Sequence, residues 1–292
     1  LGEELLQAPI RSSRNGDAHE INGVAFKAIN PMTLPVARRM SPIYAAAELL
    51  WYLTWDNRGD MISHYAPSYT SFLEYGADGV VRANGGYGTR WGQQIPRLLE
   101  LLRSSHDTRR ALLATWTTKD LGRDTVDQPC TVSLQFLIRD GLLHLIATMR
   151  SNDAWLGLAY DTFCFTRLQS LIAADLGIPV GTYQHQVGSM HLYTKDDAKM
   201  VEVVARGATE PKRYDYAQIP AGRMMQAAER ATRLEAEIRK HKYPLSWART
   251  EIVGCMTLKG TELGALVLTV AMKDSGLVAT DGVDPSFVWM AQ

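Results

Sequence analysis

Apolar residues recur at helical spacing in several stretches of the chain. The first, SPIYAAAELLWYL, begins with Ser41, a candidate N-cap, and Pro42, a residue favoured at the first helical position. Gly177 follows another periodic stretch and is a typical helix terminator. The pattern predicts helices over residues 42–53, 93–104, 161–176, 195–206 and 226–242.

Shorter apolar runs bounded by turn residues predict strands. CTVSLQFLI and LLHLIATMR are joined through Arg139, Asp140 and Gly141, which is typical of a hairpin. Because the predicted helices do not alternate strictly with strands, we expect the α+β class, with a mixed or mainly antiparallel sheet packed with helices. Further strands are predicted in RRALLATW, in VGSMHLY and over residues 251–258 and 265–272.

Composition narrows the possible ligands. The chain has 292 residues, and 31 lysines and arginines balance 31 aspartates and glutamates. This balance provides no broad basic field for nucleic acid or an anionic membrane, so an anionic ligand has to meet a local cluster of cations. Since no linker rich in proline, glycine or serine divides the chain, we expect residues 1–292 to form a single domain.

Three cysteines, Cys130, Cys164 and Cys255, are too few and too scattered for a disulfide framework or a zinc site. A reducing, cytoplasmic setting fits them best. The chain carries neither an apolar run long enough to span a membrane nor a leader-like segment, although it starts at Leu1. We therefore expect a soluble cytoplasmic protein without a metal.

Cys130 is a candidate nucleophile because it follows a proline at the mouth of a predicted strand. A small buried hydrophobe is the commoner role for a cysteine. Nearby cations would favour the nucleophile, since they lower the pKa of a thiol. Arg109, Arg110 and Arg150 border predicted strands, where arginines are usually solvated or paired. If they converge, they would form a phosphate site.

Four further residues carry candidate chemistry. Glu48 lies in an apolar helix, where burial would raise its pKa and suit it to proton transfer, unless the helix edge reaches water. Asp161 lies in another apolar run, and a helix cap is its plainest role. His191 and Tyr193 alternate along a predicted strand and so share one face, where packing is their commoner role.

From about residue 11 to residue 195 these segments resemble the thymidylate synthase superfamily. AELLWYL resembles the helix of the catalytic glutamate, which falls on Glu48, and QPCTVSLQF resembles the nucleophile motif PCHxxxQF, which falls on Cys130. NGGYGTRW is similar to GxxYGxxWR and assigns a folate-side role to Tyr87. DTRR resembles the paired arginines that reach across a dimer to the partner's phosphate, here Arg109 and Arg110.

The remaining motifs of the resemblance assign the ligand contacts. RSND with LGLAYD resembles RSxDxxLGLPFN, which implies phosphate contacts by Arg150 and Ser151. HLY is similar to the motif that holds the sugar 3′-hydroxyl through His191 and Tyr193. SRNG resembles the phosphate loop and points to Arg14, with Arg11 as the alternative. The implied folate-side residues are Phe72, Tyr87, Asp153, Leu156, Gly157 and Tyr160.

The chain departs from the synthase pattern at Asp161, where the synthases carry asparagine. Asparagine suits uracil, whereas a carboxylic acid that accepts at one oxygen and donates at the other suits the amino group and N3 of cytosine. In this respect the chain resembles the cytidylate and deoxycytidylate hydroxymethylases. Phe72 in the place of a shielding tryptophan and Thr131 in the place of a histidine agree with that reading.

The resemblance therefore implies a homodimer through the sheet face that transfers a hydroxymethyl group from 5,10-methylenetetrahydrofolate to C5 of CMP or dCMP. CMP would point to nucleoside-antibiotic synthesis and dCMP to modified phage DNA. The alternatives are a thymidylate synthase acting on dUMP, a uracil-directed hydroxymethylase, a non-catalytic nucleotide-binding relative and an RNA-binding protein. Beyond residue 195 the resemblance fades, and VDPSFVWMAQ differs from the apolar tail that closes over folate in the synthases.

Overall fold

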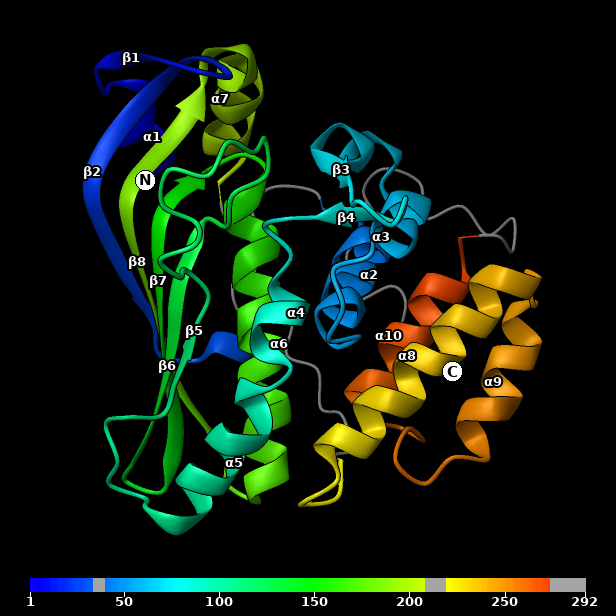
Figure 1. Cartoon of the computed structure of the whole chain (residues 1–292). Helices are drawn as coiled ribbons and strands as arrows, with labels where there is room; N and C mark the ends of the chain where they lie inside the picture. Colours follow the sequence, from blue (N-terminus) through cyan, green and yellow to red (C-terminus); the bar gives the residue numbers. More distant parts are fainter. Residues whose placement is uncertain (34–39, 208–218, 274–292) are drawn as a thin grey trace.

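A six-stranded mixed sheet forms one side of the protein, and the main helical layers pack on one of its faces (Figure 1). The structure, a computed structural model, describes residues 1–33, 40–207 and 219–273. The strand order is β1-β2-β8-β7-β6-β5, and all neighbours are antiparallel except β7 and β8. The strands are β1 (Ile10–Ser13), β2 (Gly16–Ala28), β5 (Leu112–Ala114), β6 (Thr131–Arg139), β7 (Leu142–Asp153) and β8 (Val180–Tyr193), and β3 (Leu73–Tyr75) pairs with β4 (Val81–Ala83) in a second sheet.

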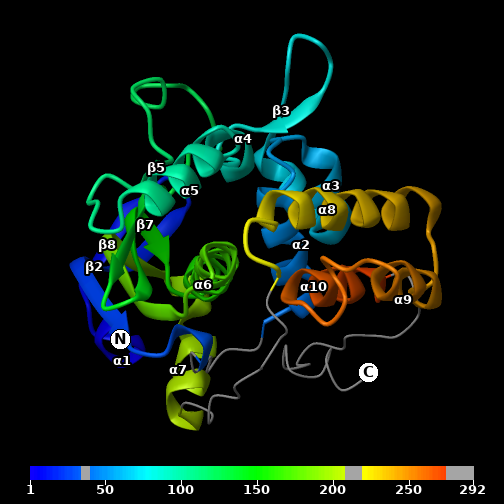
Figure 2. The same cartoon turned by 90° about the horizontal axis from the view of Figure 1, so that it is seen from below.

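One long helix, α6 (Gly157–Leu176), connects the two parallel strands and lies against one face of the sheet (Figure 2). Helix α2 (Pro42–Tyr52) packs on α6, and α8 (Met224–His241) and α10 (Glu262–Ala271) pack on α2. The mixed sheet with its helical layers confirms the α+β class. The remaining α-helices are α1 (Gly2–Leu6), α3 (Gly59–Tyr65), α4 (Tyr87–Trp91), α5 (Gln94–Ser104), α7 (Asp197–Arg206) and α9 (Leu245–Val253), and the 3-10 helices are η1 (Pro31–Thr33), η2 (Pro67–Phe72) and η3 (Thr194–Asp196).

The local signals that predicted these elements operate as expected. Ser41 accepts a hydrogen bond from the backbone of Tyr44 and caps α2. Gly177 adopts a left-handed conformation, with φ of 70°, and ends α6. Asp140 and Gly141 both have positive φ and form the two-residue turn between β6 and β7.

The inward-facing positions of β7 and β8 change phase toward the carboxyl end of each strand. The buried residues alternate up to Met149 and Val187 and resume at Asn152 and Met190. Close contact requires glycine at this point of β8, since a Cβ at Gly188 would lie 2.9 Å from the carbonyl oxygen of Arg150. The strands curve (Figure 1), and side chains from both sides of this point contact α6: Tyr183 interacts with Thr162, and Asn152 donates to Asp161.

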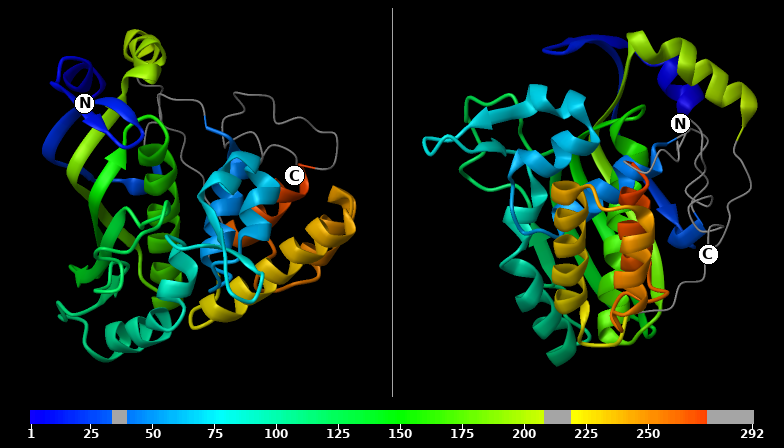
Figure 3. Two further views of the ribbon diagram at one scale, coloured as in Figure 1. Left: turned by 45° about the horizontal axis from the view of Figure 1, so that its top comes forward. Right: turned by 90° about the vertical axis from the view of Figure 1, so that its right-hand side faces the viewer.

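Two predicted strands are wrong. Residues 251–258 and 265–272 fall in and around α9 and α10, the helices beside α8 in Figure 3. A short apolar run cannot be assigned to a strand or to a buried helix from periodicity alone. In α10 nearly every residue is buried, and its N-cap, Thr261, accepts a hydrogen bond from the backbone of Gly264.

Two expectations from the sequence concern membrane-spanning segments and the sheet face at which a dimer would form. In the described part of the chain, no helix is long and apolar enough to cross a membrane. No helix among the described residues covers the sheet face opposite α6 (Figures 1 and 2). Partly exposed side chains of three strands lie on that face, among them Gln135, Leu137, Ile146, Thr148 and Gln184. The C-terminal VDPSFVWMAQ lies outside the described residues.

Candidate active site

Cys130 lies directly before β6 and contacts Arg150 of β7. Its Sγ is 3.7 Å from Nη2 of Arg150, whose backbone nitrogen donates to the carbonyl oxygen of Cys130. Burial raises the pKa of the Cys130 thiol to about 11, against the opposing effect of the Arg150 charge. The negative charges of Asp161 and Asp127 raise it further. In the ligand-free protein the thiol is therefore protonated at neutral pH.

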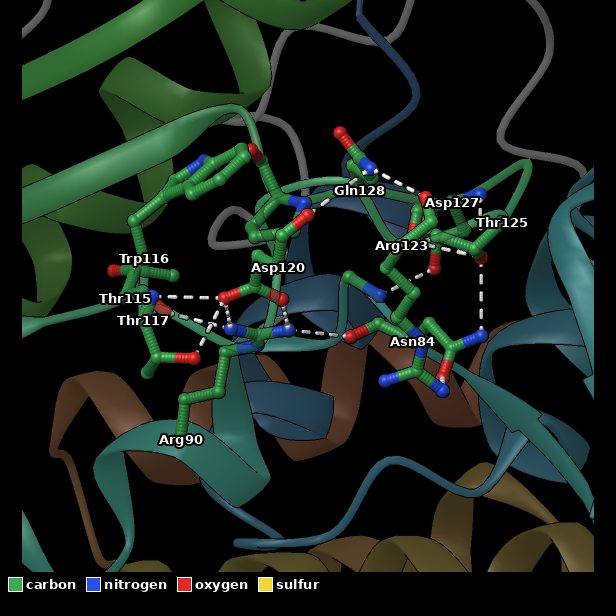
Figure 4. Close-up of polar contacts among 12 residues, drawn as sticks. Asn84, Arg90, Thr115, Trp116, Thr117, Asp120, Arg123, Thr125, Asp127 and Gln128 are labelled. Atoms are coloured by element: carbon green, nitrogen blue, oxygen red, sulfur yellow. Dashed lines mark hydrogen bonds and ion pairs between the residues drawn. The ribbon is translucent and has the colours of Figure 1, made fainter.

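The loop that leads into Cys130 is held by an ion pair that the sequence analysis did not identify (Figure 4). Both terminal nitrogens of Arg90 donate to the carboxylate of Asp120 over 2.7 Å, and both residues are largely buried. Arg90 also donates to the carbonyl oxygens of Asn84 and Thr115. Trp116, at the start of the loop, donates from its indole nitrogen to the carbonyl oxygen of Pro129, the residue before the nucleophile.

Glu48 points from α2 into the space between α2 and α6. The hydroxyl of Tyr44 donates to its Oε1 over 3.1 Å, and Sγ of Cys164 lies 3.7 Å from its Oε2. Burial raises the pKa of Glu48 to about 7. Tyr160 supports this arrangement, because its hydroxyl accepts from the backbone of Ser41 and its ring packs edge-on against Tyr44.

Asp161 lies in the second turn of α6 and does not cap it. The helix begins at Gly157 after Leu156, which provides no side-chain cap, so the capping role considered for Asp161 is wrong. Its Oδ2 accepts from Nδ2 of Asn152 over 2.7 Å. Burial, followed by the negative charge of Glu48, raises the pKa of Asp161 to about 8.

Gly157 leaves room for this hydrogen bond. A Cβ at Gly157 would lie 2.9 Å from Nδ2 of Asn152 and 3.1 Å from Oδ2 of Asp161. Only a residue without a side chain allows the first turn of α6 to approach the pair so closely.

Tyr87 connects the nucleophile with the helical layer. Its hydroxyl accepts from the backbone nitrogen of Thr131, the residue after Cys130, over 3.3 Å. Burial raises the pKa of Tyr87, and the charges of Asp161 and Cys130 contribute to the increase. The structure thus brings Cys130, Tyr87 and Asp161 into one cluster.

The predicted sugar and phosphate residues meet at the same end of the sheet. Ser151 of β7 lies 3.3 Å from Nδ1 of His191 on β8. Asn15, in the turn between β1 and β2, donates to the hydroxyl of Tyr193. The neighbouring Arg14 donates to the carbonyl oxygens of Thr125 and Val126, in the loop before Cys130, whereas Arg11 is exposed on β1.

Other predicted residues occupy different positions. Asp153 accepts from the backbone nitrogens of Trp155 and Leu156 and so shapes the turn before α6. Leu156 is half exposed. Arg109 and Arg110 are exposed and precede β5. The backbone of the next residue, Ala111, hydrogen-bonds to Phe136, so both arginines lie toward the end of β6 that is remote from Cys130. The structure therefore does not bring these arginines to the nucleophile of the same chain.

A comparison with known families decides the class of the protein. The model of the thymidylate synthase family matches residues 22–229. The chain belongs to the thymidylate synthase family. It is 27% identical over 228 residues to the deoxyuridylate hydroxymethyltransferase of Bacillus phage SP01, a match that covers 70% of this chain and 58% of that relative. The match thus spans little more than half the length of this relative.

Within this thymidylate synthase family member, Tyr69 is an aromatic residue that the sequence analysis missed. Its ring packs edge-on against Trp51, and burial raises its pKa, with contributions from the charges of Asp127, Glu48 and Cys130. Phe72, which the sequence analysis placed where the synthases carry a shielding tryptophan, is 42% exposed, and its ring lies 5.6 Å from that of Tyr69. Tyr69 precedes Phe72 by three residues, which is one turn of η2, and this spacing is the signal that could have identified Tyr69.

Proposed function

We propose that the protein hydroxymethylates C5 of a cytosine nucleoside monophosphate, CMP or dCMP, with 5,10-methylenetetrahydrofolate as the one-carbon donor. The observation that carries the proposal is Asp161, a partly buried carboxyl group with a pKa of about 8, whose charge acts on the thiol of the candidate nucleophile. A protonated Asp161 can donate to N3 of cytosine and accept from its amino group at the same time. Aspartate in place of asparagine therefore favours cytosine over uracil.

Cys130 is the proposed nucleophile. Its Sγ adds to C6 of the pyrimidine, which makes C5 nucleophilic, and it is expelled when the product forms. Because burial keeps the pKa of Cys130 at about 11, the thiol has to lose its proton within the nucleotide complex, with the adjacent Arg150 charge stabilising the thiolate. The folate supplies a one-carbon unit at the oxidation level of formaldehyde.

Glu48 is the proposed proton-transfer group for the water that becomes the new hydroxyl. Its pKa of about 7 allows both protonation states near neutral pH, which suits a group that accepts a proton from water and returns one. Leu156 and Phe72 present large apolar side chains to solvent near Asp161 and Tyr69. Such surfaces fit the flat ring system of a folate, and we assign them to its binding site together with Tyr87, Asp153, Gly157 and Tyr160.

The nucleotide phosphate would be held by Arg14, Arg150 and Ser151, and the sugar by His191 and Tyr193. Guanidinium groups match phosphate oxygens in pairs. Arg109 and Arg110 lie too far along β6 to join this set within one chain. We propose that a second subunit docks on the uncovered sheet face and supplies them.

Hydroxymethylation of dUMP is the second candidate. It is favoured by the similarity to a protein described as a deoxyuridylate hydroxymethyltransferase. The hydroxymethylation reactions of cytosine and uracil nucleotides share every step except recognition of the base. A third activity, reductive methylation of dUMP, would in addition release dihydrofolate.

The deciding experiment offers CMP, dCMP, UMP and dUMP, each tritiated at C5, to the protein with formaldehyde and tetrahydrofolate. We expect tritium release and a 5-hydroxymethyl product from a cytosine nucleotide, and neither from the Cys130→Ala variant. Turnover of dUMP alone would establish the second candidate, and dihydrofolate with dTMP would establish the synthase reaction. No tritium release from any of the four would reject catalysis of this class.

The role of Asp161 is tested by the Asp161→Asn variant. An amide at this position donates toward O4 and accepts from N3 of uracil. We expect the ratio of kcat/KM for cytosine over uracil nucleotides to fall by about tenfold or more. An unchanged ratio would contradict the base-reading role.

A further inference from the structure

A chain of buried hydrogen bonds runs from β8 through β7 to Asp161. The hydroxyl of Tyr183 lies 2.5 Å from Nδ1 of His185, and Nε2 of His185 lies 3.2 Å from Oδ1 of Asn152. Nδ2 of Asn152 in turn donates to Oδ2 of Asp161 over 2.7 Å. Tyr183, His185 and Asn152 are buried almost completely, and Thr162, next to Asp161 on α6, hydrogen-bonds to Tyr183.

The direction of each hydrogen bond follows from the orientation of the Asn152 amide, which turns Oδ1 toward His185 and Nδ2 toward Asp161. Oδ1 of Asn152 can only accept, so Nε2 of His185 carries a hydrogen. Burial lowers the pKa of His185 to about 4, so its ring is neutral and Nδ1 has no hydrogen. Tyr183 is therefore the donor to Nδ1, and every bond of the chain donates toward Asp161.

This direction restricts the proton of the Asp161 carboxyl group. Oδ2 already accepts from Asn152, and the carbonyl oxygen of a carboxylic acid accepts better than its hydroxyl oxygen. In the protonated form, Oδ1 therefore carries the hydrogen. A carboxylic acid whose proton could occupy either oxygen would pair with cytosine and with uracil alike, since the two bases present donor and acceptor in opposite order.

We propose that Oδ1 of Asp161 faces N3 of the base, and that Tyr183, His185 and Asn152 are positioning residues that fix the proton of Asp161 on Oδ1 and thereby favour cytosine over uracil. The proposal rests on the proposed function, because it concerns the same base-reading group. It adds that selectivity depends on residues that do not touch the nucleotide. A packing role alone would also explain their burial, but it would not couple them to the choice of base.

The ring contacts of His185 explain how the orientation of its ring is held. Phe26 stacks on the imidazole at 5.1 Å between ring centroids, so the ring cannot turn to exchange its two nitrogens without disturbing the sheet. Without the Tyr183 hydroxyl, Nδ1 can take the hydrogen and Nε2 becomes an acceptor. The Asn152 amide then turns over, its carbonyl oxygen faces Asp161, and the proton of Asp161 moves to Oδ2.

The test compares Tyr183→Phe and Asn152→Ala with the wild type for kcat/KM on the cytosine and uracil nucleotides. We expect the cytosine-to-uracil ratio to fall by at least about fivefold in both variants, as is typical when one buried hydrogen bond is lost. The matched control is Tyr65→Phe, which removes a buried tyrosine hydroxyl from its 2.9 Å bond to Glu235. We expect this control to retain the wild-type ratio.

Nitrogen NMR of the histidine rings tests the chain independently of catalysis. In the wild type we expect Nε2 of His185 to be protonated and Nδ1 to be unprotonated, with its signal assigned by its absence from His185→Phe. In Tyr183→Phe we expect the hydrogen to shift toward Nδ1. A wild-type ring that is protonated on Nδ1 would overturn the proposal.

The outcomes separate this proposal from the proposed function. A wild type that turns over neither base rejects the function, while the His185 tautomer still tests the chain. A selective wild type whose ratio changes in Asp161→Asn but not in Tyr183→Phe or Asn152→Ala overturns the positioning role alone. An equal change in Tyr65→Phe also overturns it, since general loosening of the core would then account for the effect.

Discussion

The guanidinium of Arg150 lies 3.7 Å from Sγ of Cys130, on the strand next to the one that Cys130 precedes. It is the nearby positive charge that opposes the effect of burial on the thiol pKa. In Arg150→Gln we therefore expect this pKa to rise further. For a rise of about one unit, alkylation by iodoacetamide at pH 8.5 slows about tenfold.

The measurement follows carbamidomethylation of Cys130 by mass spectrometry over time. Arg139→Gln is the control, since Arg139 lies at the opposite end of β6 and donates to the carbonyl oxygen of Ile138. We expect the wild-type rate in this control. Equal rates in both variants would show that Arg150 does not act on the thiol.

Burial of Asp161 predicts an unusual dependence of stability on pH. Its pKa is raised from 3.8 to about 8, so between these values the unfolded chain releases a proton that the folded protein keeps. The free energy of unfolding therefore falls as pH rises through this window. Asp161→Asn removes this loss, and we expect it to gain on the order of a few kcal/mol relative to the wild type between pH 4.5 and 8.5.

Urea denaturation at the two pH values measures this difference. Asp78→Asn is a suitable control, because Arg82 holds the pKa of the exposed Asp78 below its ordinary value, so that its titration lies below the window. We expect no pH-dependent gain in this variant. The same absence in Asp161→Asn would show that Asp161 is ionised in the folded protein at neutral pH.

Gly157 predicts a reversal of ordinary helix propensity. Replacing glycine by alanine within a helix usually stabilises it by about 1 kcal/mol. At Gly157 the added methyl group would instead lie within 3.1 Å of both partners of the Asn152–Asp161 bond. We expect Gly157→Ala to lower the free energy of unfolding, as measured by chemical denaturation, and to reduce activity.

Two comparisons isolate the cause. Gly254→Ala has only ordinary contacts of 3.5 Å or more for its new Cβ, and we expect it to be neutral or stabilising. In an Asn152→Ala background the cost of Gly157→Ala should shrink, because one of the crowded groups is gone. Equal costs in both backgrounds would place the strain elsewhere.

Local signals in the sequence predicted much of the fold. Ser41 with Pro42, Asp140 with Gly141, and Gly177 each act within a few residues, so they define α2, the β6–β7 turn and the end of α6 without tertiary information. The buried α10 carries no such periodic signal, since nearly every side chain is apolar and enclosed. Its helical state follows from packing against α2 and α8.

The candidate site likewise contains residues that the sequence indicates and residues that only the fold brings together. Cys130, Glu48 and Asp161 stand out as reactive or costly residue types in apolar surroundings. Asn152 and His185 are 33 positions apart and meet because β7 and β8 change phase between them. That contact depends on the curvature of the sheet, which the sequence indicates only through Gly188. Strict alternation from Met149 would place Ser151 inward, so the strand pattern alone does not identify Asn152.

The ion pair between Arg90 and Asp120 predicts coupling between stability and the nucleophile. Both partners are largely buried, and Asp120 also accepts from the backbone and hydroxyl of Thr117. Arg90→Gln leaves the Asp120 carboxylate without its charge partner, which typically costs about 3–5 kcal/mol when the pair is buried. Chemical denaturation measures that loss. Since the pair anchors the loop before Cys130, we also expect a changed rate of Cys130 alkylation under native conditions.

The exposed pair of Arg82 and Asp78 provides the matched control, because it has the same bidentate geometry in solvent. Solvent screening makes such a pair contribute little, so Arg82→Gln should leave both the unfolding transition and the alkylation rate within experimental error. The pH dependence adds a second check. Arg90 holds the pKa of Asp120 at about 2, so its contribution is present above about pH 4 and is lost as pH falls toward 2. A wild type and an Arg90→Gln variant that lose stability equally over that acid range would contradict the role of the pair.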